Sequence, residues 1–256
     1  MKNILVLVAL SFFVGNYAQT NADEILNNYF ENTGGIENWQ KLQGLKMIGK
    51  VNGQGMEIPI EIIQLKDGRQ YVKINFQGKE LMQGVYDGKV LWNTNFMTQK
   101  AEVMTTEDTE NFKKNQVNDF PTPFLDYKEK GYKIELLEDE TMEGTECFKL
   151  KLTQNPVLVD GKEEDNVSFY YFEKENFVPI AMEMEIKSGP MKGQMMKSTM
   201  SDYEEVEGLY FPFSLSQMGG PLSIETIELN PDVNLDIFEM PKEEEESTAP
   251  PIKEKK

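Results

Sequence analysis

Residues 56–62 read MEIPIEI, and this short stretch decides the fold class. Every second residue is Met or Ile, and Glu or Pro stands between them. Successive side chains of a β-strand point to opposite faces, so this alternation predicts a strand with one apolar face and one solvated face.

The same alternation recurs along the chain. It is found at 72–76, 148–152, 178–186 and 209–215. Turn-forming pairs stand between these stretches, Asp-Gly at 67–68, 87–88 and 160–161 and Gly-Gly at 219–220. About a dozen short strands with such spacing predict a mainly β chain, built as an antiparallel barrel or a sandwich.

The ends of the chain predict other structures. Residues 1–18 have a lysine, an apolar run too short to span a bilayer and a small residue at Ala18, which is typical of a signal peptide. Residues 19–241 are expected to form one domain that begins with helices over 21–33 and 36–42. Residues 242–256 are rich in Glu, Pro and Lys and predict a disordered acidic tail.

One internal stretch lacks the strand pattern. Residues 105–131 are polar with scattered aromatic residues and two prolines, at 121 and 123. An insertion of this length in a compact domain is typically a functional flap, so we expect a loop with one or two short helices that serves as a lid.

Composition excludes several classes of function. The chain has no His and one cysteine, Cys147, so His-dependent catalysis, His-ligated zinc and an internal disulfide are excluded. The formal net charge is −18 and Arg69 is the single arginine, which argues against a nucleic-acid partner. We expect no cofactor.

Two kinds of chemistry remain open at this point. Acidic residues could form a carboxylate pair of the glycosidase type, but no two of the 44 are marked by a motif. Six methionines fall between Met182 and Met200, and thioether sulfurs suit Cu(I). The same methionines suit an adaptable apolar wall, and a purely structural envelope domain is a further alternative.

The order of motifs resembles a known family. A helix ending at Gly34-Gly35, the run DGKVLW at 87–92, FEKENFVP at 172–179 and GLYFP at 208–212 follow one another along a strand-rich chain. This order is similar to that of the LolA-type outer-membrane lipoprotein carriers and their LolB-like relatives, over about residues 20–241.

The resemblance implies a non-enzymatic, monomeric periplasmic carrier. Its fold would be an open antiparallel β-barrel of about 11 strands, with a concave apolar face that holds acyl chains of a lipoprotein or lipid. Inner-membrane donor and outer-membrane acceptor proteins would be its partners. No cysteine lies near residue 19, which favours a soluble shuttle over a lipid-anchored receptor.

We therefore expect the acyl-binding face to be built from the apolar residues of the alternating strands. They are Met56, Ile58, Ile60, Ile62, Val72, Ile74, Phe76, Trp92, Ile180, Met182, Met184, Met196, Met200, Phe211 and Phe213. Arg69, which we place on the third strand, is a candidate lid contact, because the carriers that this chain resembles use an arginine for that purpose. A groove of this composition can hold an acyl chain without a charged group, since each methylene that is buried contributes about 0.8 kcal/mol to the binding free energy.

Overall fold

The computed structural model describes residues 21–53, 55–217 and 220–241. The predicted signal peptide and acidic tail lie outside these residues. The helices are α1 (Ala22–Asn32), α2 (Ile36–Lys41) and α3 (Thr106–Lys114), with short 3-10 helices η1 (Gln116–Asp119) and η2 (Leu235–Phe238).

Strands make up most of the rest. They are β1 (Gly44–Gly53), β2 (Met56–Leu65), β3 (Gln70–Phe76), β4 (Lys79–Tyr86), β5 (Leu91–Thr94), β6 (Ala101–Val103), β7 (Lys133–Leu136), β8 (Glu140–Met142), β9 (Thr145–Thr153), β10 (Val157–Val159), β11 (Lys162–Glu164), β12 (Val167–Glu173), β13 (Pro179–Glu185), β14 (Met195–Val206), β15 (Leu209–Gln217) and β16 (Gly220–Leu229).

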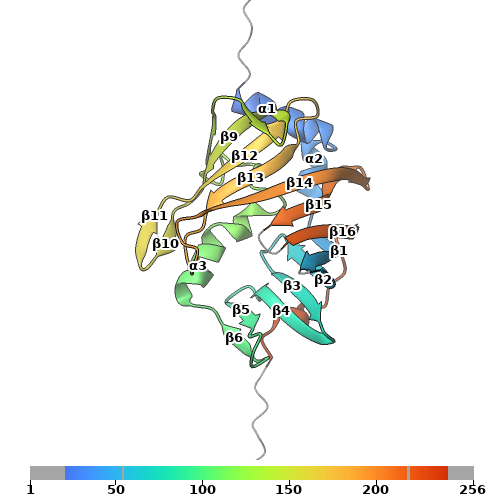
Figure 1. The fold of residues 1–256 in the computed structure, drawn as a ribbon, viewed down its shortest axis with the longest axis vertical. Coiled ribbons are helices and arrows are strands. Elements are labelled where there is room, and N and C mark those ends of the chain that lie inside the picture. Colours follow the sequence, from blue (N-terminus) through green and yellow to red (C-terminus); the bar gives the residue numbers. More distant parts are fainter. Residues whose placement is uncertain (1–20, 54, 218–219, 242–256) are drawn as a thin grey trace, which may run out of the picture.

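Fourteen of these strands form one antiparallel sheet. Its order is β6-β5-β4-β3-β2-β1-β16-β15-β14-β13-β12-β9-β7, with β8 also paired to β9, while β10 and β11 form a separate hairpin. No pairing joins β6 to β7 within the described chain, so the curved sheet is open (Figure 1). The expectation of a mainly β, open antiparallel barrel is confirmed, with more strands than the 11 expected.

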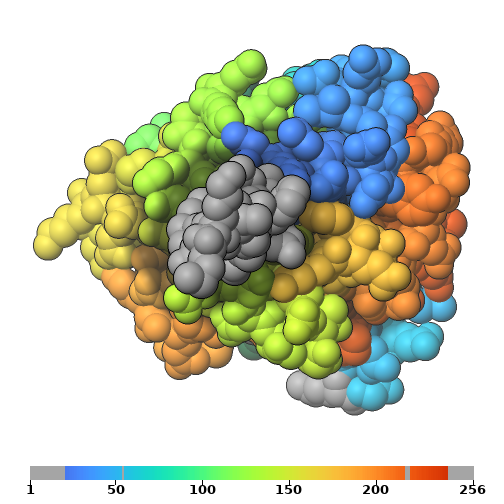
Figure 2. Space-filling view, turned by 90° about the horizontal axis from the view of Figure 1, so that it is seen from above, coloured from blue at the N-terminus to red at the C-terminus, as the bar shows by residue number. Residues whose placement is uncertain are grey.

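Helices α1 and α2 close one end of the sheet. The Asn21 side chain accepts a hydrogen bond from Glu24 N at 3.0 Å and caps α1, as the sequence predicts. Gly34 then turns the chain with a φ of 111°, and a Cβ there would meet the carbonyl oxygen of Gly208. Seen from this end, the blue helices lie against green and orange parts of the chain (Figure 2).

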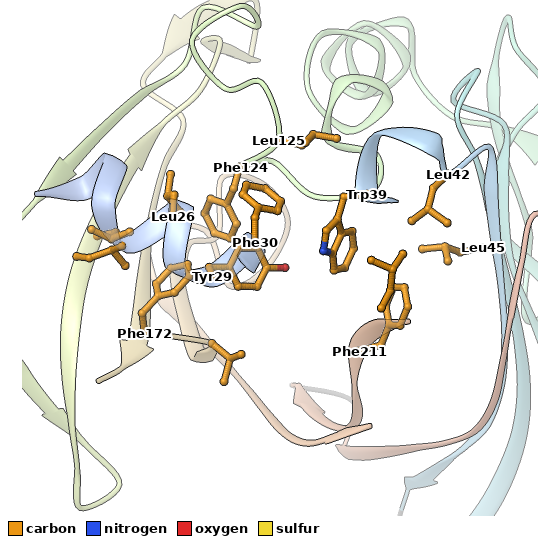
Figure 3. Packing of buried hydrophobic residues seen from close by; sticks show 14 residues of the cluster. Leu26, Tyr29, Phe30, Trp39, Leu42, Leu45, Phe124, Leu125, Phe172 and Phe211 are labelled. Atoms are coloured by element: carbon orange, nitrogen blue, oxygen red, sulfur yellow. The ribbon is translucent and has the colours of Figure 1, made fainter. Parts of the chain in front are cut away.

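The closed end is filled by a large aromatic and aliphatic cluster. Tyr29, Phe124 and Phe172 meet edge to face, with ring centroids 5.3–5.9 Å apart. The rings of Trp39 of α2 and Phe211 of β15 pack together with their centroids 5.1 Å apart, and Figure 3 shows the two side chains next to each other. These contacts fix the helices to the sheet. A groove of about 1140 Å³ remains beside the cluster, between the start of α1 and the strands β7 and β9, and is lined by Ala22, Ile134 and Phe148.

Helix α3 lies across the open side of the sheet. Its N-terminus is a capping box between Thr105 and Asp108, and it contacts both β5 and β10. Phe112 packs against Tyr86 with ring centroids 4.9 Å apart. The segment 105–131 therefore contains the short helices that the sequence predicts, and it bridges parts of the sheet that are far apart in strand order (Figure 1).

Candidate functional site

The face of the sheet that carries α1, α2 and the 105–131 segment is the inner face. Strand register assigns residues to it, because cross-strand partners point to the same side. Gln64 is the cross-strand partner of both Gln70 and Leu45, and Leu45 belongs to the buried cluster beneath α1 and α2. Residues an even number of positions from them along β2 and β3 therefore also face inward.

Strands β2 and β3 supply one apolar part of the inner face. Ile62 lies opposite Val72 and Ile60 opposite Ile74. Ile62, Val72 and Ile74 are half-buried, and none of these residues belongs to the packed clusters of the described chain. Ile58 and Phe76 continue the same face toward the hairpin ends, and Met56 is exposed at the start of β2.

Methionines supply a second part on β13 and β14. Met184 lies directly opposite Met196, and Met182 lies opposite Ser198. Met182 also pairs with Tyr170, which packs against the inner cluster, so these side chains face inward. Met200 is on the same face of β14 as Met196. All four methionines are half-buried, which gives an apolar wall of flexible side chains.

The strands between these two parts carry further inward apolar residues that our sequence analysis missed. Leu215 lies opposite Met200 and Leu222, and Leu222 lies opposite Val51 of β1. The alternation at 222 and 224 could have identified β16. β1 pairs with β2 without a shift, but Ile48 faces outward and Gly49 takes an inward position, which interrupts the apolar alternation of that strand.

Phe211 and Phe213 sit at the closed end of this face. Phe211 is buried against Trp39, and Phe213 packs against the same cluster while staying half-buried. The structure therefore places Phe211 in the floor of the closed end and leaves Phe213 at its border with the open part.

The position of Trp92 is a correction to the sequence analysis. Its side chain is 2% exposed and packs in a cluster with Ile63 and Tyr71. This cluster lies on the outer face, because the adjacent residues Ile62 and Val72 point inward and side chains alternate along a strand. Trp92 Nε1 donates a hydrogen bond to the backbone oxygen of Phe238, 2.9 Å away. Residues 91 and 92 are both apolar, so alternation alone could not choose the face.

Ile180 is a second correction. The register between β12 and β13 shifts at Tyr171 and Phe172, next to Pro179. This irregularity breaks the alternation from 178 to 186, and Ile180 packs against the outer cluster of Cys147, Tyr171 and Ala181. Met182 and Met184 lie beyond the shift and keep the inward direction.

Arg69 lies in the turn before β3 rather than on the strand. Its guanidinium forms an ion pair with Asp67, and Nε donates to the backbone oxygen of Asp87 at 3.4 Å. It therefore ties two turns together, and it lines the same groove as residues 119–121 of the predicted lid. The neighbouring Gly68 lies against the segment, where a Cβ would come within 2.7 Å of Val117.

The 105–131 segment is anchored at several points. Asn111 exchanges two hydrogen bonds with the backbone of Leu158, at 2.7 and 2.8 Å. Asp119 accepts hydrogen bonds from Gln154 and Tyr132 at 2.9–3.0 Å. Burial raises the pKa of Asp119, although these hydrogen bonds act in the opposite direction.

Two of the grooves beside this segment are lined by sequence-predicted site residues. One has a volume of about 410 Å³ and is lined by Met184, Met196 and Asn111, together with Val157 and Lys187. The other, of about 280 Å³, is lined by Gln70, Arg69 and residues 119–121. The segment therefore covers part of the inner face, and the methionine wall opens into the larger groove.

The described residues offer little for other chemistry. No group of three or more acidic or Cys side chains stands close enough together to hold a metal ion in this part of the chain. Cys147 is fully buried on the outer face, and burial raises its pKa, which opposes formation of a reactive thiolate. No helix in the described part is long and apolar enough to cross a membrane.

Comparisons with known proteins return similarities of structure. No protein-family model matches the chain, and no curated protein sequence matches it significantly. A LolA superfamily protein from Nitrosomonas europaea is 14% identical with a TM-score of 0.49, over 86% of this chain and 98% of that chain.

Two further structures cover a similar share of the molecule. A putative outer membrane lipoprotein-sorting protein domain from Vibrio parahaemolyticus is 11% identical with a TM-score of 0.47, over 84% of this chain and 94% of that chain. A DUF1329 family protein from Desulfovibrio piger is 14% identical with a TM-score of 0.47, over 84% and 97%. One of the three is described as a member of the superfamily that the sequence resembles.

Proposed function

We propose that this protein is a periplasmic carrier or binding protein that holds the acyl chains of a lipoprotein or lipid on the inner face of its open sheet. The observation that carries the proposal is the half-buried apolar surface shared by β1–β3 and β13–β16. A contiguous apolar surface that stays partly exposed in the folded protein is typical of a binding site.

The size of the surface suits a hydrocarbon chain. It runs over seven neighbouring strands, which are about 4.8 Å apart in a sheet. Each methylene that leaves water contributes about 0.8 kcal/mol, so a long acyl chain needs no ionic contact to be held. The proposal includes no catalytic step, and donor and acceptor proteins at the two membranes are its partners.

The 105–131 segment is the proposed lid. It crosses the inner face and is attached to the β10–β11 hairpin by polar contacts of Asn111 and to the core by Phe124. Release of the ligand would require the polar contacts to open, while Phe124 stays fixed in the closed end. Arg69 supports the turns beneath this segment.

Solvent extraction of the protein purified from the periplasm, followed by mass spectrometry, tests the proposal. We expect co-purifying phospholipid or acylated species, and binding of a fluorescent fatty acid after delipidation. Protein that is consistently free of lipid and fails to bind the probe would refute the carrier function.

Binding of Cu(I) is a second candidate, favoured by the arrangement of the methionines. Four of the six between 182 and 200 share the inner face, and Met184 is directly opposite Met196. Met191 and Met195 are exposed and stand apart from this group. A competition titration with a Cu(I) chelator decides the matter, and absence of stoichiometric transfer would eliminate this candidate.

A further inference from the structure

Helix α3 and the β10–β11 hairpin lie side by side (Figure 1). The groove of about 410 Å³ opens between them and the adjoining ends of β13 and β14, and we name it the α3 groove. Met184 and Met196 of the methionine wall line it from the sheet, and residues 157–159 line it from the hairpin. Its volume is within the range of about 300–1,000 Å³ that is typical of small-molecule sites. The apolar inner face therefore ends in a groove that a ligand can fill.

Asn166 is a buried polar residue beside the methionine wall. Its side chain is 8% exposed and lines the α3 groove. Its backbone oxygen accepts a hydrogen bond from Gln154 N at 3.0 Å, which continues the pairing of β9 with β12. Asn166 therefore points to the same face as Ser168, two residues farther along, and Ser168 lies opposite Met184 on the inner face.

A chain of hydrogen bonds fixes the orientation of the Asn166 amide. Gln154 Nε2 donates to both carboxylate oxygens of Asp119, at 2.9 and 3.0 Å, and a carboxylate can only accept. Gln154 Oε1 in turn accepts a hydrogen bond from Asn166 Nδ2 at 3.4 Å. Asn166 Oδ1 has no hydrogen-bond partner in the described part of the chain. The atom left available to the groove is therefore an acceptor.

The charged residues that line the α3 groove disfavour an anionic ligand. Two are basic and four are acidic, namely Lys187, Lys192, Glu107, Asp108, Asp160 and Glu185. Both lysines are already paired, Lys187 with Glu185 at 2.9 Å and Lys192 with Asp160 at 3.1 Å. A carboxylate or phosphate in the groove would therefore face an excess of negative charge, and an uncharged group would not be repelled.

We infer that the α3 groove holds the uncharged head group of an acyl ligand, and that Asn166 Oδ1 accepts a hydrogen bond from a donor on that head group. A donor that replaces water at this oxygen keeps the hydrogen bond, whereas a head group without a donor loses it at a buried position. The acyl chain extends from Met184 and Met196 toward Met182, the next inward residue of β13. The inference rests on the proposed function and narrows its ligand to neutral acyl compounds with a free donor, such as a monoacylglycerol.

Displacement of a fluorescent fatty acid from the delipidated full chain tests the inference. The competitors are the monoacylglycerol, the methyl ester and the free acid of one acyl chain, at neutral pH. The wild type should bind the monoacylglycerol about fivefold more tightly than the methyl ester, which has no donor. The free acid, as a carboxylate, should bind most weakly. In Asn166→Leu the preference for the monoacylglycerol should be lost, while binding of the methyl ester is kept and shows that the variant is folded.

The matched control is Asn52→Leu. Asn52 is exposed and follows the inward Val51 on β1, so its side chain points outward, and this variant should keep the wild-type preference. Equal affinities of the wild type for the two esters, tightest binding of the free acid, or a preference that Asn166→Leu retains or Asn52→Leu also loses would overturn the head-group site. Each of these results leaves the carrier function standing. Failure of the wild type to bind any of the acyl ligands would refute the carrier function itself.

Discussion

Replacement of Met184 by aspartate places a carboxylate on the apolar wall of the inner face. Met184 is half-buried, directly opposite Met196, and lines the groove beside α3. A charged group there excludes the ligand from the neighbouring two or three methylene positions. At about 0.8 kcal/mol per methylene the loss is about 2 kcal/mol, or about 30-fold in the dissociation constant.

The assay is titration of delipidated protein with a fluorescent fatty acid. The matched control is Met195→Asp, because Met195 is the next residue to Met196 on β14 but is 55% exposed and points away from the groove. Met184→Leu keeps the wall apolar and should bind within about twofold of wild type. Urea unfolding of each variant separates loss of binding from loss of the fold.

The outcome that refutes the reasoning is specific. If Met184→Asp is folded and binds as tightly as the wild type, the methionine wall is not part of the site. If Met195→Asp weakens binding as much as Met184→Asp, the effect comes from charge alone and the assignment of the two faces of β14 is wrong.

Three further predictions follow from the packing and the charges. Trp92→Phe should bind the fatty acid within about twofold of the wild-type affinity, because Trp92 is in the outer cluster. A larger loss of affinity in the same titration would show that Trp92 is part of the binding site. Phe124→Ala should lower the free energy of unfolding by about 3–5 kcal/mol in urea, and a loss below about 1 kcal/mol would show that the segment is loosely attached. Burial raises the pKa of Asp119 above its ordinary 3.8, so the folded chain binds this proton more tightly than the unfolded chain. Between pH 7 and about 4 the wild type should therefore gain stability relative to Asp119→Asn as the pH falls, and a constant or opposite difference in urea midpoints would contradict this sign.

Sequence patterns identify the strands whose two faces differ most. The alternation at 56–62, 72–76 and 209–215 corresponds to β2, β3 and β15, and the cap at Asn21 marks the start of α1. These predictions succeed because they depend on local backbone geometry and on a period of two residues.

The errors arise where the chain departs from that period. The register shift beside Pro179 sends Ile180 outward. On β1 an outward Ile48 and a glycine at the inward position 49 interrupt the apolar alternation. Leu91 and Trp92 are both apolar. Trp92 packs against η2, more than 140 residues farther along the chain, whereas Leu91 packs against Phe112 of α3. Such tertiary contacts leave no local signal in the sequence.

Photo-crosslinking tests the central claim, that an acyl chain lies on the inner face between β2–β3 and β13–β14. A diazirine fatty acid is bound to the full chain, illuminated, and the labelled peptides are mapped by mass spectrometry. We predict labels on the peptides that contain Ile62, Val72, Met184 and Met196. Labels confined to the outer-face peptides that contain Trp92 or Tyr171, or labelling that excess unlabelled fatty acid does not reduce, would contradict the account.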